Sequence, residues 1–371
     1  MVRENNTKRK THAMTSIIAS ILVVALAVLV FLYHDKLASA DVPGGNAQAA
    51  SAGEPFTYEN GSKQMFALMG DNLAIASSTG LQLLDNSGNT VSRQVFTMTN
   101  PAVCSSGNYS AFYDVGGKSL RVFRDKDYVQ MDQDNAIISV SLNSSGFLAV
   151  NEQASGYKGC VTVYDAKQQA VYAWSSGSGY TIDADVSPDS STLAVLCVES
   201  SGSVIHFFRL DSEKEIGSVQ LKDELGFRLR YSSDGRLCVL SEKALHFYSQ
   251  DGKSISDYSF GENYLANYEL GDDFCAVAVS KYVSGSNVSL ISFSSEGKVL
   301  ATIPLSDEPV SLFSRRQQLL VLDSANISLY SRALEPVRRS QVAPGFVSAA
   351  LLSNGNVLLL STRYGEEYKI R

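Results

Sequence analysis

The sequence lacks the residue patterns that most enzymes and cofactor-binding proteins carry. It has only four histidines, no G-x-x-x-x-G-K-[ST] or G-x-G-x-x-G phosphate loop, and no G-x-S-x-G elbow of a serine hydrolase. Two of the histidines, His206 and His246, take the same place in neighbouring repeats, which favours packing over metal binding, and no third ligand accompanies them. We therefore predict no cofactor, no metal site and no catalytic residues.

The five cysteines do not form a disulfide or zinc pattern, because no two of them are close in the sequence. Cys197, Cys238 and Cys275 fall at matching places in successive repeats, each within a hydrophobic strand pattern. We interpret these cysteines as small buried residues of the core.

Acidic residues outnumber basic residues outside the first residues of the chain. The net charge is −7, whereas residues 1–13 contain Arg3, Lys8, Arg9 and Lys10 against a single acid, Glu4. The rest of the chain is therefore acidic, which argues against nucleic acid as a partner because phosphate binding needs a basic surface.

Long hydrophobic runs are absent except at residues 14–33, which form an uncharged apolar segment of 20 residues. A helix of this length spans about 30 Å, the thickness of the bilayer hydrocarbon. Its basic N-terminal flank places the N-terminus in the cytoplasm. We predict a cytoplasmic tail at residues 1–13, a transmembrane helix at 14–33, a flexible linker at 34–53 and an extracytoplasmic domain at 54–371. The alternative is a signal peptide cleaved after Ala40, which also exports the domain.

What the sequence does contain is a repeat of about forty residues from residue 60 onward. Each unit has a Ser-x-Asp-Gly type of turn before a hydrophobic strand, as in 187–196 and 232–240, and a later strand that ends in an aromatic or aliphatic marker residue. The markers are Leu84, Phe123, Tyr164, Phe208, Tyr248, Phe293, Tyr330 and Tyr368. Four short strands in forty residues is the size of one propeller blade.

We therefore predict an all-β protein, a β-propeller of eight four-stranded blades preceded by one transmembrane helix. Seven blades is the alternative count, because the second unit, residues 102–131, is short and poorly patterned. The last unit ends at its third strand, and an extended stretch at residues 55–59 precedes the first unit. We expect the N-terminal strand to complete the final blade and close the ring.

These turns, the marker strands and the N-terminal anchor resemble an uncharacterised family of membrane-anchored extracytoplasmic propellers of Gram-positive anaerobic bacteria, with WD-like repeats. The resemblance covers roughly residues 14–371. The WD signature itself is absent, since Trp174, the single tryptophan, is not followed by Asp. The resemblance implies a propeller outside the cytoplasmic membrane, and it implies no catalytic residues.

One group of charged residues is a candidate ligand site. Alignment of the turns at 187–189 and 232–234 places Asp183 opposite Arg228, and Asp185 opposite Arg230, on the innermost strands of adjacent blades. Strand alternation puts these four side chains on the channel side of the blades. We interpret them as pairs between blades that line a wet channel, or as a cradle for a charged ligand.

The second candidate site is a set of tyrosines in Gly- and Ser-rich loops, which we call the tyrosine rim. Its members are Tyr157, Tyr180, Tyr264, Tyr282 and Tyr364. All five are predicted at one face of the ring, and tyrosine offers a large apolar surface with a hydroxyl for contact with a protein or a glycan. The alternative is that each tyrosine packs its own loop.

The sequence thus predicts a single-pass membrane protein whose propeller binds or scaffolds an unknown envelope protein or cell-envelope glycan. The alternative is a propeller enzyme, a hydrolase, lyase or quinone-dependent dehydrogenase, with its site at the central channel. Fold analogy alone supports that alternative.

Overall fold

The computed structural model describes residues 50–51, 53–59 and 61–370, with side chains from residue 53 onward. The membrane segment predicted at residues 14–33 lies outside these residues. Within the described part of the chain, no helix is long and apolar enough to cross a membrane.

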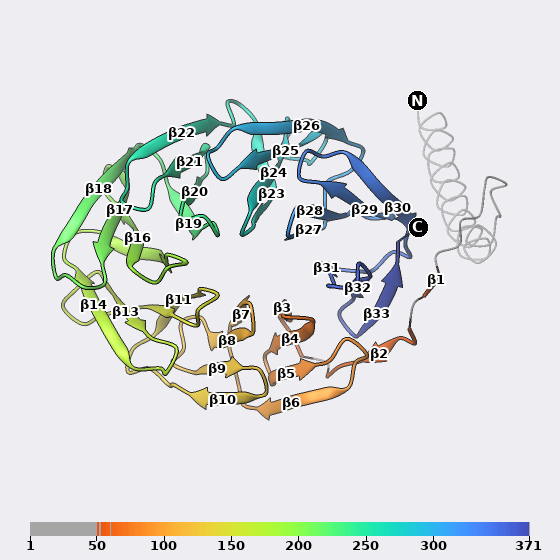
Figure 1. The fold of residues 1–371 in the computed structure, drawn as a ribbon, viewed down its shortest axis with the longest axis horizontal. Helices are drawn as coiled ribbons and strands as arrows, with labels where there is room; N and C mark the ends of the chain where they lie inside the picture. Colours follow the sequence, from red (N-terminus) through yellow and green to blue (C-terminus); the bar gives the residue numbers. More distant parts are fainter. Residues whose placement is uncertain (1–49, 52, 60, 371) are drawn as a thin grey trace, which may run out of the picture. The chain divides into compact units, whose positions relative to one another are not determined.

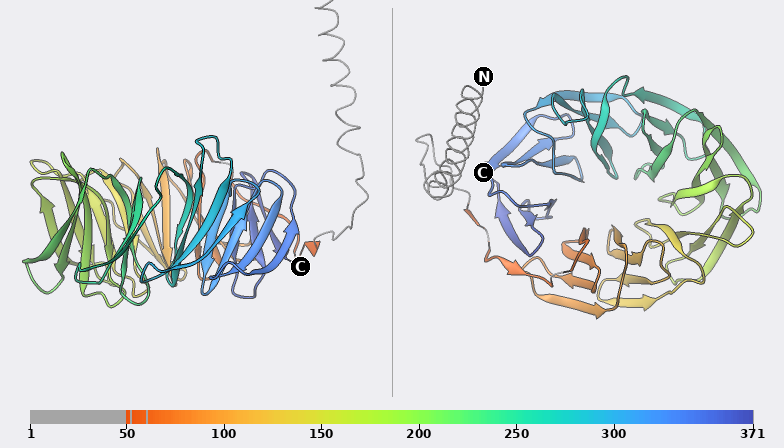
Figure 2. Two further views of the ribbon diagram at one scale, coloured as in Figure 1. Left: turned by 90° about the horizontal axis from the view of Figure 1, so that it is seen from above. Right: turned by 180° about the vertical axis from the view of Figure 1, so that it is seen from behind.

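The described residues form an all-β propeller of eight antiparallel blades arranged in a ring (Figure 1). We call the centre of the ring, toward which the innermost strands lie, the channel. In each blade the strands follow one another outward from the channel, and they run between the two faces of the ring (Figure 2). Blades 1 to 4 consist of β3 (Met65–Met69), β4 (Asn72–Ser77), β5 (Gly80–Leu84) and β6 (Thr90–Val95); β7 (Pro101–Ser106), β8 (Tyr109–Asp114), β9 (Leu120–Arg124) and β10 (Asp127–Gln130); β11 (Ile137–Leu142), β12 (Leu148–Glu152), β13 (Gly159–Tyr164) and β14 (Ala170–Ser176); and β15 (Tyr180–Val186), β16 (Thr192–Glu199), β17 (Gly202–Arg209) and β18 (Glu215–Lys222).

The remaining blades follow the same order. Blades 5 to 8 consist of β19 (Gly226–Tyr231), β20 (Leu237–Ser241), β21 (Ala244–Tyr248) and β22 (Ser254–Ser259); β23 (Tyr264–Leu270), β24 (Phe274–Ser280), β25 (Val288–Ser294) and β26 (Val299–Leu305); β27 (Ser311–Arg315), β28 (Gln318–Leu322), β29 (Asn326–Ser331) and β30 (Pro336–Gln341); and β31 (Ser348–Leu351), β32 (Val357–Leu360) and β33 (Tyr364–Lys369). Every marker residue of the sequence repeat lies on the third strand of its blade, so the predicted eight-bladed count is confirmed and seven is excluded.

The chain's N-terminal strands complete blade 8, as predicted. Strands β1 (Ala50–Ser51) and β2 (Phe56–Thr57) both pair antiparallel with β33. The hydroxyl of Tyr58 donates to the carbonyl oxygens of Ser361 and Tyr364, which ties the end of β2 to the last blade. Tyr58 also joins the apolar cluster that connects blades 8 and 1, so the ring closes through packing as well as pairing.

The core lies between the blades, where hydrophobic residues of adjacent sheets pack together. Between blades 4 and 5, for example, Leu196 and Phe207 pack with Leu229 and Val239. Such a cluster occupies each of the eight blade junctions in the described chain. Each blade therefore depends on both of its neighbours for the burial of its apolar surface.

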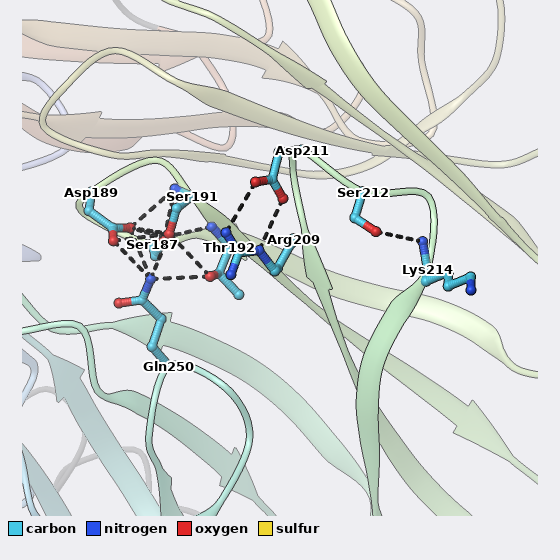
Figure 3. Close-up of polar contacts among 9 residues, drawn as sticks. All are labelled: Ser187, Asp189, Ser191, Thr192, Arg209, Asp211, Ser212, Lys214 and Gln250. Carbon is cyan, nitrogen blue, oxygen red and sulfur yellow. Dashed lines mark hydrogen bonds and ion pairs between the residues drawn. The ribbon is translucent and has the colours of Figure 1, made fainter.

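The Ser-x-Asp turns join blades as well as strands (Figure 3). In the turn after β15, Asp189 accepts a hydrogen bond of 2.6 Å from the hydroxyl of Ser187. The side-chain amide of Gln250, which comes from blade 5, donates to both carboxylate oxygens of Asp189 at 3.0 Å. Partial burial opposes the effect, but the hydrogen bonds from Ser187, Gln250 and Ser191 lower the pKa of Asp189 to about 2. The turn that repeats in the sequence is thus a contact point between blades.

The outermost strand carries a β-bulge near its start in six of the eight blades. In each case one residue of the outer strand is skipped in the pairing with the third strand. The skipped residues are all aliphatic: Val91, Val171, Ile216, Ile255, Leu300 and Val337.

Candidate functional site

Four consecutive innermost strands carry a second type of bulge, and these strands hold the predicted channel residues. The pairing of β11, β15, β19 and β23 with the next strand skips one residue in each blade, whereas the innermost strands of blades 1, 2, 7 and 8 pair without a shift. The skipped residues are Ile138, Ile182, Phe227 and Ala266. A bulge re-aims the side chains that follow it. Blades 3 to 6 therefore differ from the rest of the ring in how they present side chains to the channel.

After these bulges the four strands place polar residues in two tiers around the channel. The first tier is Ser139, Asp183, Arg228 and Asn267, and the second is Ser141, Asp185, Arg230 and Glu269. The structure thus brings all four predicted channel residues together on β15 and β19, which are neighbouring innermost strands. Glu269 was not predicted, although it lies two residues after Asn267 on β23 and so falls in the tier of Asp185.

The two aspartates bind the backbone of the next blade. Asp183 accepts a hydrogen bond of 3.1 Å from the backbone N–H of Leu229, and Asp185 accepts one of 2.8 Å from that of Tyr231. Both carboxyls are buried, with exposed fractions of 3% and 7%. Burial raises the pKa of Asp183 despite the Arg228 charge, and it raises the pKa of Asp185 to about 6 despite the charge of Arg230.

Glu269 uses the same arrangement between blades 6 and 7. One of its carboxylate oxygens accepts hydrogen bonds from the backbone N–H and the hydroxyl of Ser314, at 2.9 and 2.7 Å. Burial raises its pKa, and the Ser314 hydrogen bonds oppose that rise. The acids of the channel therefore act first as acceptors for the adjacent innermost strand.

The two arginines are more available than the acids. The Arg228 side chain is 46% exposed, and its Nη1 lies 3.5 Å from the Asp183 carboxylate, which is a long contact. Arg230 does not bind Asp185; its Nη2 donates to Asp272 on the turn after β23, at 2.7 Å. The Nε of Arg230 is buried and makes no hydrogen bond to any described residue.

These side chains line a cavity of about 200 Å³ in the channel. Its wall combines the four predicted residues with Glu269, two tyrosines, a cysteine and aliphatic residues: Val103, Cys104, Tyr113, Val140, Leu142, Leu229, Tyr268 and Leu270. Three further hollows share Arg230 as a wall residue, and the two larger ones have volumes of about 110 and 550 Å³. Their other lining residues include Ser233, Asp272 and Arg316, which lie in turns between first and second strands. The cavity therefore lies toward the face that carries the Ser-x-Asp turns, which we call the turn face.

The tyrosine rim lies at the opposite face, because its loops join second to third strands or lead into the next blade. Four of its members are exposed, with fractions of 56% for Tyr157, 59% for Tyr180, 52% for Tyr264 and 49% for Tyr282. Lys158 lies over the ring of Tyr180 at 4.7 Å and bonds its hydroxyl. Tyr364 is less exposed than the other four, because it is half-buried and its ring packs edge-on against Phe346.

The structure brings only two of the rim tyrosines together. Tyr264 begins β23, and Tyr282 follows β24, whose last residue pairs with Tyr264. Both line a groove of about 1200 Å³, together with Phe227, Glu242, Gly261, Glu262, Asn263, Leu265 and Lys281. Leu225 and Val283 lie in the neighbouring loops and are 53% and 81% exposed. We call this set the blade 5–6 groove.

His206, His246 and the cysteines hold structural positions. His246 lies between two carboxylates, with ring nitrogens 2.8 Å from Asp257 and from Glu224, while His206 contacts Glu215 at 2.9 Å. The described residues contain no group of three or more His, Cys, Asp or Glu side chains that could hold a metal ion. Cys197, Cys238 and Cys275 are buried in strands, and all five cysteines are free thiols.

The fold is similar to that of solved propellers at low sequence identity. The C-terminal WD40 domain of Sif2 matches with 12% identity and a TM-score of 0.61, over 88% of this chain and 100% of that chain. BamB from Moraxella catarrhalis matches with 10% identity and a TM-score of 0.54, over 86% of this chain and 99% of that chain. A eukaryotic initiation factor matches with 12% identity and a TM-score of 0.54, over 86% of this chain and 91% of that chain. Such distant likeness shows the fold alone.

No curated protein matches the sequence. A family model does match, over residues 54–333, which cover seven of the eight blades nearly completely. The chain therefore belongs to a propeller family described as a family of unknown function, DUF5711.

Proposed function

We propose that this protein is a single-pass membrane protein whose propeller lies outside the cytoplasmic membrane and binds or scaffolds an envelope protein or glycan. The apolar, uncharged segment at residues 14–33 and its basic flank support the anchor. The resemblance to anchored propellers of Gram-positive anaerobes supports the same placement. The family description adds no activity, so the binding surface itself must carry the proposal.

The observation that carries it is the blade 5–6 groove. Tyr264, Tyr282 and Phe227 provide exposed aromatic surface beside the polar groups of Glu262 and Lys281. Exposed apolar residues that gather at one place, with a polar border, are typical of interaction sites. Aromatic residues concentrate binding energy because each buries a large area on contact. The flanking aliphatic residues Leu225 and Val283 favour a protein over a glycan as the partner.

The experiment is a pull-down of detergent-solubilised envelope proteins and of isolated cell-wall glycan with the full chain. We expect wild type to retain a specific partner, and the double variant Tyr264→Ala/Tyr282→Ala to lose at least about tenfold in affinity, the size of effect typical for central aromatic residues. Tyr157→Ala is the matched control, because it removes an equally exposed tyrosine from the same face at blade 3. Full binding by the double variant would reject the groove as the site.

The enzymatic alternative has less support from the channel. Asp185 has the raised pKa of a candidate acid, but its carboxylate is hydrogen-bonded to the Tyr231 amide of the next strand. Asp183 and Glu269 are engaged in the same way. These three carboxylates connect adjacent blades, so the arginines are the charged side chains of the channel that remain available to a ligand.

A further inference from the structure

We propose that the cavity between blades 2 and 6 binds a small organic carboxylate between Arg228 and Arg230. This site lies toward the turn face, away from the blade 5–6 groove, so the inference stands independently of the partner proposed above.

The first argument is the state of the two guanidinium groups. Arg228 is half-exposed in the cavity wall, where its guanidinium makes a long contact of 3.5 Å with Asp183 and interacts with the Tyr268 side chain. Arg230 uses one nitrogen for Asp272, and its Nε–H has no acceptor among the described residues. A buried guanidinium N–H without an acceptor is costly, and a ligand oxygen would satisfy it.

The second argument is the spacing of the arginines. They lie two residues apart on β19, after its bulge, so their side chains leave the same face of the strand. Two residues of a strand span roughly 6.6 Å, so one carboxylate can bridge the two groups, or a short dicarboxylate can pair with both. Planar guanidinium groups match the two oxygens of a carboxylate in geometry.

The third argument concerns the nearby acids. Asp183 and Asp185 accept hydrogen bonds from the backbone of β19, and Glu269 accepts them from Ser314, so these carboxylates are committed to blade contacts. When ionised, these three carboxylates offset the charge of the two guanidinium groups. Asp272 is different, because its side chain is 66% exposed and only one of its carboxylate oxygens accepts a hydrogen bond from Arg230. An incoming carboxylate would compete with Asp272 for Arg230.

The size and polarity of the cavity select the ligand. A volume of about 200 Å³ corresponds to roughly seven water molecules at about 30 Å³ each, which suits an anion of a few carbons. Val103, Val140 and Leu142 give the cavity an aliphatic wall that suits a short carbon chain better than an inorganic ion. Succinate is therefore a suitable probe, with inorganic phosphate as the comparison.

The test is isothermal titration calorimetry of the full chain in detergent with succinate, acetate and inorganic phosphate, each up to about 10 mM. We expect saturable binding of succinate, weaker binding of phosphate, and at least about tenfold weaker succinate binding by Arg228→Gln and by Arg230→Gln, since charged hydrogen bonds contribute at this level. Arg316→Gln is the matched control, because Arg316 is exposed at the channel mouth but lies outside the cavity. Its affinity should not change.

Two further variants make the outcome decisive. Asp272→Asn should bind succinate more tightly than wild type, because it removes the internal competitor without touching the cavity acids. Arg228→Lys keeps the charge and guards against loss of fold as the cause of weak binding, and it should fall between wild type and Arg228→Gln. The proposal would be overturned if wild type did not bind succinate, or if Arg228→Gln and Arg230→Gln bound succinate as tightly as wild type. Tighter binding of phosphate than of succinate would also overturn it.

Discussion

At the scale of single residues, the channel acids are held in a position that is unfavourable for their charge. Asp183 and Asp185 are buried, Glu269 is partly buried, and each accepts a hydrogen bond from the neighbouring blade. Burial of a carboxylate costs free energy that such bonds recover only in part. The position of Asp183 near Arg228 followed from the sequence alignment, because the turns on either side set the register. The ion pair of Arg230 with Asp272 could not be predicted from the alignment, because it depends on the path of the turn after β23 in blade 6.

A pH dependence of stability follows from Asp185. Its pKa is about 6 in the folded protein and about 3.9 when unfolded, so the folded state binds more protons between these values. Its contribution to stability is therefore lost as the pH rises from about 4 to about 6. Relative to wild type, Asp185→Asn should gain up to roughly 3 kcal/mol in unfolding free energy between pH 4 and pH 7.

Urea unfolding at several pH values measures this difference. Asp211→Asn serves as the control, because Asp211 forms an exposed ion pair with Arg209 far from the channel and its pKa is lowered. That variant should keep the wild-type slope between pH 4 and pH 6. A parallel pH profile for Asp185→Asn and wild type would contradict the assignment of a raised pKa to Asp185.

At the scale of elements, the sequence predicted the strands β11, β15, β19 and β23 but not the bulges within them. The alternation of polar and apolar residues predicted these strands and the face of their charged residues. The bulges could not be predicted, because the skipped residues Ile138, Ile182, Phe227 and Ala266 share no local signal. A bulge arises when the turns at both ends of a strand pair fix registers that differ by one residue, so it is a property of the assembled blade.

The contribution of Tyr58, which follows strand β2, to the closure of the ring can be tested by mutation. Tyr58→Phe removes two hydrogen bonds to carbonyl oxygens of blade 8 while keeping the buried ring. We expect it to lower the unfolding free energy by about 1–3 kcal/mol, because the carbonyl oxygen of Ser361 loses its donor. The carbonyl oxygen of Tyr364 keeps its bonds from the amide and the hydroxyl of Ser361. Tyr128→Phe should change stability by less than about 0.5 kcal/mol, since Tyr128 lies exposed on β10. Equal stability of the two variants, measured by urea unfolding, would show that the Tyr58 hydroxyl does not secure the closure.

At the scale of the whole molecule, the eight-bladed ring was predictable because each unit carries its own turn and marker residue. Closure by residues 55–59 was predictable from the missing fourth strand of the last unit. The cavity was not, because it combines residues from β7, β11, β15, β19 and β23, and the sequence gives no measure of channel width. The groove beside Tyr264 and Tyr282 depends in the same way on loops of two blades.

Closure predicts the behaviour of truncated chains. A chain that begins at residue 48 keeps β1 and β2, whereas a chain that begins at residue 61 leaves β33 with a free edge. We expect the shorter chain to melt at a lower temperature and to self-associate, because an unpaired edge offers backbone groups to another strand. Light scattering coupled to size exclusion and a thermal melt compare the two chains. A monomeric, equally stable shorter chain would show that three strands suffice for blade 8.

The aliphatic bulges of the outer strands have a consequence for solubility at high local concentration. A ring of blades presents its outermost strands around the whole perimeter, so every copy could in principle donate or accept a strand in several directions at once. Such a multivalent perimeter favours open-ended polymers whenever copies are crowded. Because Val171, Ile216 and their counterparts interrupt the run of evenly spaced backbone groups, an approaching strand finds only a few groups in register before it diverges. At these six blades the perimeter is thereby a poor template for fibres, and the two faces of the ring are left as the surfaces for specific contacts.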